Sequence, residues 1–197
     1  MNIKKAEELF KQAMEQGLGL DLSDPNLVDT PKRFAKMIAT EFMANTSADK
    51  KELAGIVKSF PNEKKFDEII MLDNIPFVST CSHHLLPFPG LAWLLYVPDK
   101  KLMGASKAAR IINFFSKKLQ LQENLSTEII TAVMEHIEPK GAMLVMRAVH
   151  GCMSCRGVKT GSGAGMTTSA TRGCFRDNID TRVEALELIK LSAFLQK

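Results

Sequence analysis

Residues 75–98, IPFVSTCSHHLLPFPGLAWLLYVP, decide the fold of the domain around them. Residues 75–80 are rich in the β-branched and aromatic side chains typical of strands. Residues 91–97 form a continuous apolar run that ends at Pro98, which predicts a buried strand. Residues 66–72, just upstream, are strand material as well. The stretch therefore predicts strands separated by a cysteine- and histidine-rich connection.

The sequence downstream predicts two helices and then two more strands. Ser106 and Ser126 are each expected to cap a helix with an apolar face. Pro139 and Gly141 end the second helix, and residues 142–149 form a strand. A Gly/Thr/Ser-rich stretch over 157–173 follows, in which 161–165 is a loop between strands. Asp180 or Thr181 is expected to cap a last helix that reaches the C-terminus. From residue 66 the order is strand, strand, helix, helix, strand, strand.

The first third of the chain predicts helices only. Apolar residues recur at helical spacing from Ile3 to Met14, and Gly17 follows as a stop. Thr30 and Pro31 are expected to be the N-cap and first residue of a second helix. A weaker helix is expected over 50–58. We therefore expect an α+β protein, with an N-terminal helical extension over 1–62 and a catalytic domain over 63–197.

Bulk composition excludes several classes of protein. The chain has 197 residues, is 45% hydrophobic and carries a net charge of +4. That charge is too weak, and too free of Lys/Arg tracts, to predict nucleic-acid binding. No apolar run reaches the roughly 18 residues of a membrane span, and no signal peptide is visible. We expect a cytoplasmic protein, whose four cysteines are metal ligands or free thiols rather than a disulfide framework.

Two clusters have the composition of a metal site: residues 81–84, CSHH, and residues 150–156, HGCMSCR. In a closed model, Cys81, His84, Cys152 and Cys155 complete a structural Cys₃His site. In an open model, three protein ligands leave a fourth position for water, whose pKa zinc lowers to about 7. A third possibility is a reduced protein that holds no metal.

The histidines next to these ligands favour the open model. His83 and His150 are not needed to close the site, and histidine is the side chain best suited to move protons at neutral pH. If the second cluster continues as an extended strand, alternation puts His150 and Cys152 on one face and Cys155 on the other. The fourth histidine, His136, is expected only to contact solvent from a helix face.

The sequence resembles the GTP cyclohydrolase I family in five segments that occur in the same order. Residues 79–90, STCSHHLLPFPG, resemble its zinc and catalytic segment, and residues 148–157, AVHGCMSCRG, resemble its second one. Residues 104–110, GASKAAR, resemble its phosphate-binding helix start. Residues 119–123, LQLQE, resemble its base-recognition segment, and residues 29–37, DTPKRFAKM, resemble an N-terminal helical element. Five ordered matches are far more specific than any single motif.

The resemblance implies a fold, an activity and an assembly. The fold is the tunnelling fold, a ββααββ antiparallel sheet with helices on one face. The reaction is zinc-dependent hydrolysis of GTP at C8 of the purine, which releases formate and forms 7,8-dihydroneopterin triphosphate, the first step of pterin and tetrahydrofolate biosynthesis. Family members assemble as decamers of two pentamers, with active sites where subunits meet.

The resemblance also implies residue roles. Zinc is expected on Cys81, His84 and Cys152, with His83 and His150 moving protons. Glu123, with Gln122 beside it, is expected to bind the guanine edge, where one carboxylate can accept both N–H groups. The expected triphosphate ligands are Ser106, Lys107, Arg110 and Arg156, with Arg33 and Lys36 added from a neighbouring subunit.

Three residues depart from the family pattern: Ser82, Gly151 and Asn124. None of them is a proposed ligand or catalytic residue. A zinc nucleoside deaminase is a rival, but no His-x-Glu stands in a place that matches its signature, and no Pro precedes the Cys-x-x-Cys run at 152–155. A non-catalytic Cys₃His module and another purine- or pterin-acting tunnelling-fold enzyme remain the alternatives.

Overall fold

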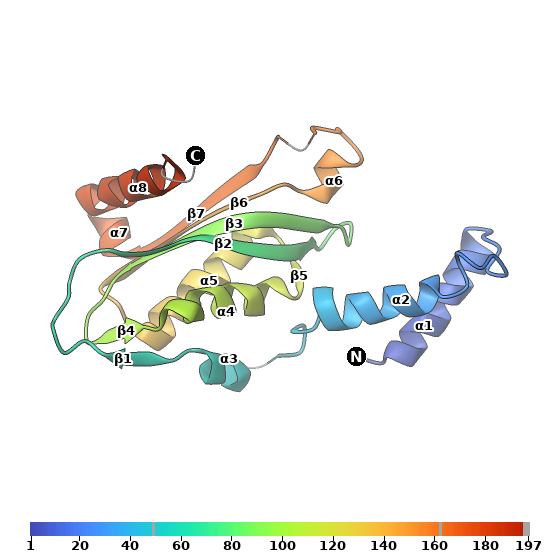
Figure 1. The fold of residues 1–197 in the computed structure, drawn as a ribbon, viewed down its shortest axis with the longest axis horizontal. Coiled ribbons are helices and arrows are strands. Elements are labelled where there is room, and N and C mark those ends of the chain that lie inside the picture. The colour runs from blue at the N-terminus through green and yellow to red at the C-terminus, as the bar shows by residue number, and fades with distance from the viewer. Residues whose placement is uncertain (49, 162, 195–197) are drawn as a thin grey trace.

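A five-stranded sheet forms the centre of the molecule, as a computed structural model shows (Figure 1). The structure describes residues 1–48, 50–161 and 163–194, so Ser162 of the predicted loop and the end of the predicted last helix lie outside it. The strand order is β5-β2-β3-β6-β7. The strands are β2 (Ile70–Cys81), β3 (Pro87–Val97), β5 (Leu119–Gln120), β6 (Gly141–Ala148) and β7 (Met166–Gly173).

The long strands pair antiparallel, and only the short β5 runs parallel to its neighbour β2. The helices α4 (Ala105–Ser116) and α5 (Gln122–Ile137) come between β3 and β6 in the chain. The order β2-β3-α4-α5-β6-β7 confirms the predicted ββααββ arrangement and the α+β class. Residues 70–72 of the segment predicted at 66–72 join the segment predicted at 75–80 in one strand, whereas residues 66–69 are not in a strand. The strand has an irregularity between Leu72 and Ile75, where Asn74 adopts a φ of 50°.

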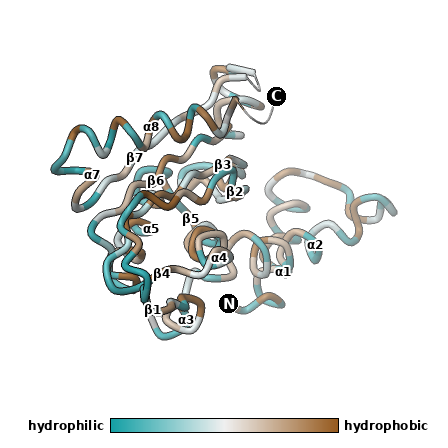
Figure 2. The backbone as a smooth tube through the Cα atoms, turned by 60° about the vertical axis from the view of Figure 1, so that its left-hand side comes forward, coloured by the Kyte–Doolittle hydropathy of each residue, from teal (hydrophilic) through white to brown (hydrophobic). Residues whose placement is uncertain are grey.

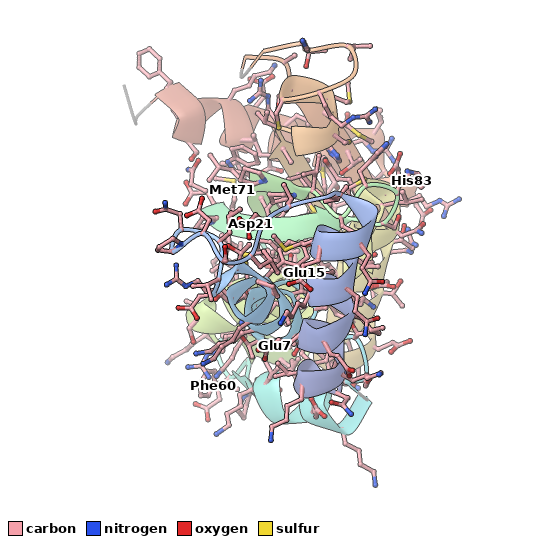
Figure 3. All side chains as sticks on the ribbon, turned by 90° about the vertical axis from the view of Figure 1, so that its right-hand side faces the viewer. Glu7, Glu15, Asp21, Phe60, Met71 and His83 are labelled. Carbon is pink, nitrogen blue, oxygen red and sulfur yellow. The ribbon has the colours of Figure 1, made fainter. Side chains whose placement is uncertain are left out.

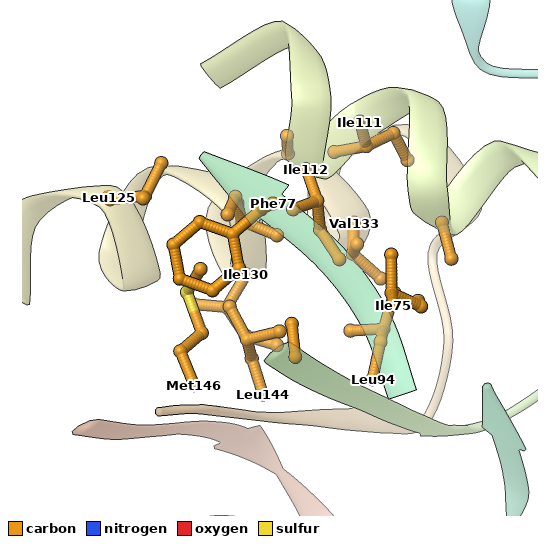
Figure 4. Close-up of a cluster of buried hydrophobic side chains, with 14 of the residues drawn as sticks. Ile75, Phe77, Leu94, Ile111, Ile112, Leu125, Ile130, Val133, Leu144 and Met146 are labelled. Carbon is orange, nitrogen blue, oxygen red and sulfur yellow. The ribbon is translucent and has the colours of Figure 1, made fainter. Parts of the chain in front are cut away.

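The main core lies between the sheet and the pair α4 and α5 (Figure 4). Side chains spaced by two along the strands meet side chains spaced by three and four along the helices, as burial of one sheet face requires. Members of this core, all at most 8% exposed, include Ile75, Phe77, Leu94, Ile111, Ile112, Leu125, Ile130, Val133, Leu144 and Met146.

The opposite face of the sheet carries a smaller cluster. Leu95 and Met143 from the sheet pack there with Phe175 of α7 (Cys174–Asp177) and Ala185 of α8 (Ile179–Phe194). Figure 1 shows α8 and the pair α4 and α5 on opposite sides of the sheet. The sheet is therefore covered by α4 and α5 on one face and, at one end, by the C-terminal helices on the other.

Three predicted helix caps in the sheet domain are displaced in the structure. The N-cap of α4 is Gly104, so Ser106 is its second residue. The helix α5 begins at Gln122, which buries Leu125 along the same face as Ile129 and leaves Ser126 inside the helix. The last helix is capped from Asn178, whose Oδ1 accepts the N–H groups of Asp180 and Thr181.

The N-terminal residues form a helical arm beside the sheet domain (Figures 1 and 2). The helix α1 (Ile3–Gln12) continues into a wider turn (Ala13–Gly17), and α2 (Thr30–Met37) continues into another (Ile38–Phe42). The two helices pack on each other, with the rings of Phe10 and Phe34 4.6 Å apart. Asp29, and not Thr30, precedes the first turn of α2.

Two further elements join the arm to the domain. The helix α3 (Lys50–Ile56) packs against α4 and contributes Leu53 to the main core. The strand β1 (Ser59–Pro61) pairs antiparallel with β4 (Lys101–Met103) just before α4. Residues 50–61 therefore pack on the sheet domain although they precede residue 63.

Among the described residues, no helix combines the length and apolar character needed to cross a bilayer.

Candidate metal centre and neighbouring polar site

A tight turn after β2 brings one cysteine and two histidines together. The turn is closed by two backbone hydrogen bonds, from Leu85 N–H to the Cys81 carbonyl and from Cys81 N–H to the Leu86 carbonyl, both 2.9 Å. Leu85 adopts a φ of 55°, which reverses the chain between β2 and β3. The ligand atoms of Cys81, His83 and His84 all lie within 4.8 Å of one another. Cys81 is buried and both histidines are exposed, and Figure 3 shows His83 at the margin of the molecule.

The second cluster folds as one helical turn, so the alternation considered for an extended strand does not apply to it. The His150 carbonyl accepts the N–H groups of Met153 and Ser154, which starts the short helix α6 (Gly151–Ser154) directly after β6. This turn brings the Cys152 thiol against that of Cys81. Burial raises the pKa of the Cys152 thiol, Cys81 raises it further, and Arg156 acts in the opposite direction.

Gly151 permits the close approach of the two clusters. A Cβ at this position would lie 2.8 Å from the Pro87 carbonyl oxygen and 3.5 Å from the Leu86 Cβ. Because real Cβ atoms do not approach a backbone oxygen so closely, any larger residue would push α6 away from the turn at 81–86. The glycine at residue 151, which departs from the family pattern, is therefore the residue that the local packing requires.

The donor atoms fit a zinc ion. Cys81 Sγ and His84 Nδ1 lie 3.8 Å apart, and the Cys152 thiol interacts with that of Cys81, although Cys152 is not in the group of donors that lie within 4.8 Å of one another. Sulfur and imidazole donors together favour zinc over the oxygen-preferring Mg²⁺ and Ca²⁺. Cys155 is exposed, and its thiol donates to the Gly151 carbonyl at 2.8 Å. The closed arrangement would require Cys155 to leave this bond.

His150 is held beside the cysteine pair by a ring and an amide. Its imidazole stacks on the buried Phe88, with ring centroids 4.5 Å apart and planes 5° from parallel. Its Nε2 lies 2.8 Å from Gln122 Oε1. Burial lowers the pKa of His150, while the nearby charge of Glu123 raises it. Glu123 itself is exposed in the first turn of α5.

Gln122 lies inside the protein, although it neighbours the exposed Glu123 in the chain. It is 1% exposed, and its amide nitrogen lies 3.1 Å from each of three acceptors: the carbonyls of Met146 and Met166 and the hydroxyl of Thr168. These contacts occupy both amide hydrogens. Glu123 is therefore the member of the pair that presents its side chain to solvent. Sequence reasoning missed the parts that Gln122 and Phe88 play beside His150, and no motif signals them.

The predicted phosphate ligands fall into two groups. Arg156 lies near the cysteines, since its charge acts on Cys152. Ser106, Lys107 and Arg110 lie at the start of α4, where Lys58, missed by sequence reasoning, joins them. Partial burial and the charges of Arg110 and Lys58 lower the pKa of Lys107.

The start of α4 is distant from the metal cluster in the same chain. Directly after α4, β5 pairs with the end of β2, where Cys81 faces Gln120. The C-terminal end of α4 is thus near the cysteines, and its twelve residues extend about 18 Å away from them. Figure 1 shows this separation along the sheet. Arg33 and Lys36 are exposed on α2 in the arm, where Arg33 pairs with Asp29 at 3.2 Å.

The family model and the sequence relatives agree on one family. Residues 6–190 match the model of the family described as GTP cyclohydrolase I. The chain is 41% identical to GTP cyclohydrolase 1 of Acetivibrio thermocellus, covering 93% of this chain and 97% of that protein. It is 39% identical to GTP cyclohydrolase 1 of Finegoldia magna, covering 97% of this chain and all of the relative. A solved structure, the archaeosine synthase QueF-Like in the apo form, is 12% identical to the chain, with a TM-score of 0.45. The match covers 54% of this chain and 94% of that chain.

Proposed function

The chain belongs to the GTP cyclohydrolase I family, and from this premise we propose how its residues divide the work of the reaction. The activity is that of a hydrolase acting on GTP. It opens the purine ring at C8, releases formate and forms 7,8-dihydroneopterin triphosphate. The observation that supports this assignment best is that three distant segments converge at one site: Cys81, His83 and His84, then Glu123, and then His150 and Cys152.

Zinc is the proposed metal, and its proposed ligands are Cys81, His84 and Cys152. Three protein ligands leave one coordination position open, and zinc held this way supplies a water of lowered pKa at neutral pH. His83 lies within 4.8 Å of the donor atoms of Cys81 and His84, and we assign it to proton transfer because Cys81, His84 and Cys152 already supply three ligands. The closed Cys₃His module is not favoured, since Cys155 is bonded to the Gly151 carbonyl.

His150 and Glu123 are the proposed partners of the purine. Burial lowers the pKa of His150, which favours the neutral ring that can accept a proton. His83 is the second proton carrier, at the exposed side of the cluster. The Glu123 carboxylate is exposed and can accept N1–H and the exocyclic amine of guanine together, which adenine cannot offer.

The triphosphate site is proposed to be shared between copies of the chain. Arg156 accompanies the metal cluster, whereas Ser106, Lys107 and Arg110 lie about a helix length away. We assign these three to the site of a neighbouring copy, together with Arg33 and Lys36 from the arm. The separation supports the homo-oligomer, a decamer of two pentamers, expected from the family resemblance. A cytoplasmic location remains part of the same proposal.

The direct test is to incubate the purified protein, loaded with zinc, with GTP. Formate and a fluorescent neopterin after oxidation are the expected products, and His150→Ala is expected to retain zinc while losing turnover. ATP is the matched control, since Glu123 should reject adenine. A zinc-loaded protein that releases no formate from GTP would refute the assignment.

A further inference from the structure

The side-chain amide of Gln122 has only one orientation that satisfies its surroundings. Its nitrogen lies 3.1 Å from the backbone carbonyls of Met146 in β6 and Met166 in β7. Carbonyl oxygens only accept hydrogen bonds, so the nitrogen and not the oxygen of the amide must face them. The side chain is 1% exposed, so bulk solvent does not reach it to replace either partner. The amide oxygen is thereby directed at His150.

The orientation of Gln122 determines which nitrogen of His150 carries the hydrogen. Gln122 Oε1 only accepts, and it lies 2.8 Å from His150 Nε2, so Nε2 must donate. In a neutral imidazole just one nitrogen is protonated, which leaves the lone pair on Nδ1. The His150 ring stacks on Phe88, with planes 5° from parallel. This contact restrains the imidazole from rotating out of the plane in which Nε2 reaches Gln122 Oε1.

We propose that Gln122 is a positioning residue that holds His150 in the Nε2–H tautomer and makes Nδ1 the atom that exchanges protons with the substrate. This inference rests on the proposed role of His150 as a proton carrier. Gln122 thus acts through His150, while its neighbour Glu123 is left to contact the purine. The carbonyls of Met146 and Met166 hold the Gln122 amide against β6 and β7. The position of these two strands therefore sets the tautomer of His150.

The first test replaces Gln122 with methionine, which has a similar length but no N–H donor and only a weak sulfur acceptor. Gln122→Met is expected to lower kcat roughly 10- to 100-fold, the range for disabling a proton carrier in part. The KM for GTP should change by no more than about twofold, and zinc content should be unchanged, because neither depends on the tautomer. A general packing defect would instead move kcat, KM and zinc content together.

Thr168→Val is the matched control. It removes a third partner of the same amide nitrogen and a hydrogen bond to Ser126, yet it leaves two carbonyls for two hydrogens. Its stability should fall, as in Gln122→Met, while its kcat stays near that of the unmodified protein. Equal losses of kcat in the two variants would overturn the proposal.

A second measurement needs no substrate and does not depend on the stability of Gln122→Met. Solid-state ¹⁵N NMR of histidine-labelled protein at mildly alkaline pH distinguishes the two neutral tautomers, and His150→Ala identifies the His150 signals among the four histidines. Protonated Nε2 with bare Nδ1 is expected, and the reverse would refute the proposal. Because this readout uses no GTP, a protein inactive on GTP would refute the proposed function and leave the Gln122 assignment to be judged separately.

Discussion

At the residue scale, the site depends on side chains that are small or turned away as much as on its donors. Gly151 and Cys155 lie on either side of Cys152, the proposed third ligand. Gly151 allows α6 to approach the turn at 81–86, and the Cys155 thiol donates a hydrogen bond to the Gly151 carbonyl. Both features can be tested without altering any proposed ligand.

Gly151→Ala is expected to weaken zinc binding and activity. The new methyl group would lie 2.8 Å from the Pro87 carbonyl oxygen, so α6 and Cys152 must move, at a cost of about 1–3 kcal/mol. Zinc content after dialysis against a weak chelator, together with kcat, measures the effect. Gly163→Ala is the control, since nothing lies within 4 Å of a Cβ there. Identical zinc retention in the two variants would contradict the packing argument.

Cys155→Ser is expected to keep both zinc and activity. The serine hydroxyl can donate to the Gly151 carbonyl as the thiol does, so the turn is preserved. Metal analysis and the formate assay decide the outcome. Loss of zinc in this variant would identify Cys155 as a fourth ligand and support the closed site.

At the scale of elements, Tyr96 joins β3 to β4. This tyrosine, the only one in the chain, is 1% exposed, and its hydroxyl oxygen accepts the N–H of Met103 at 3.0 Å. Burial raises the pKa of Tyr96, and the Met103 hydrogen bond lowers it in part. Since β4 leads directly into α4, this bond positions the start of the helix that carries Ser106 and Lys107.

The raised pKa of Tyr96 predicts a stability loss at alkaline pH. Above about pH 10 the unfolded chain releases the phenolic proton more readily than the folded one, so the free energy of unfolding falls as pH rises. Tyr96→Phe should be about 1 kcal/mol less stable at neutral pH, because the Met103 N–H loses its acceptor. It should also show a shallower alkaline decline. Urea unfolding at several pH values checks this, and parallel declines in the two proteins would exclude Tyr96 as the cause.

At the scale of the whole molecule, the polar groups assigned to GTP lie at two ends of the sheet domain and on the N-terminal arm. The metal cluster, His150 and Glu123 occupy the end of the sheet near β5, whereas Lys107 and Arg110 lie where α4 begins. A site shared between copies predicts that two inactive variants can restore each other.

Mixed assemblies of His150→Ala and Lys107→Ala chains are expected to regain activity when the two are co-expressed. With equal amounts, a site needs an intact His150 from one copy and an intact Lys107 from its neighbour, which gives about a quarter of full activity. His150→Ala mixed with Glu123→Ala is the control, because these two residues act on each other within one chain. A first mixture as inactive as its components would show that sites are not shared.

Local sequence determined the elements and the chemistry of the donors. The apolar run before Pro98, the periodicity of Ile129 to Ile137 and the pairing of cysteine with histidine at 81–84 depend on neighbours close in the chain. For that reason the ββααββ order and the candidate ligands were predictable. The starts of helices were less predictable. Ser126 resembles an N-cap, but α5 begins about one turn before Ser126, because Leu125 is buried on the core face.

Only the tertiary structure decided which of these residues meet. Cys152 reaches Cys81 through a helical turn that the sequence did not predict, and Gln122 faces His150 because β6 and β7 supply carbonyls to its amide. Likewise, the start of α4 lies away from the cysteines because β5 fixes the other end of the helix beside them. Distances between distant segments follow from strand register and helix packing, which no local pattern of residues encodes.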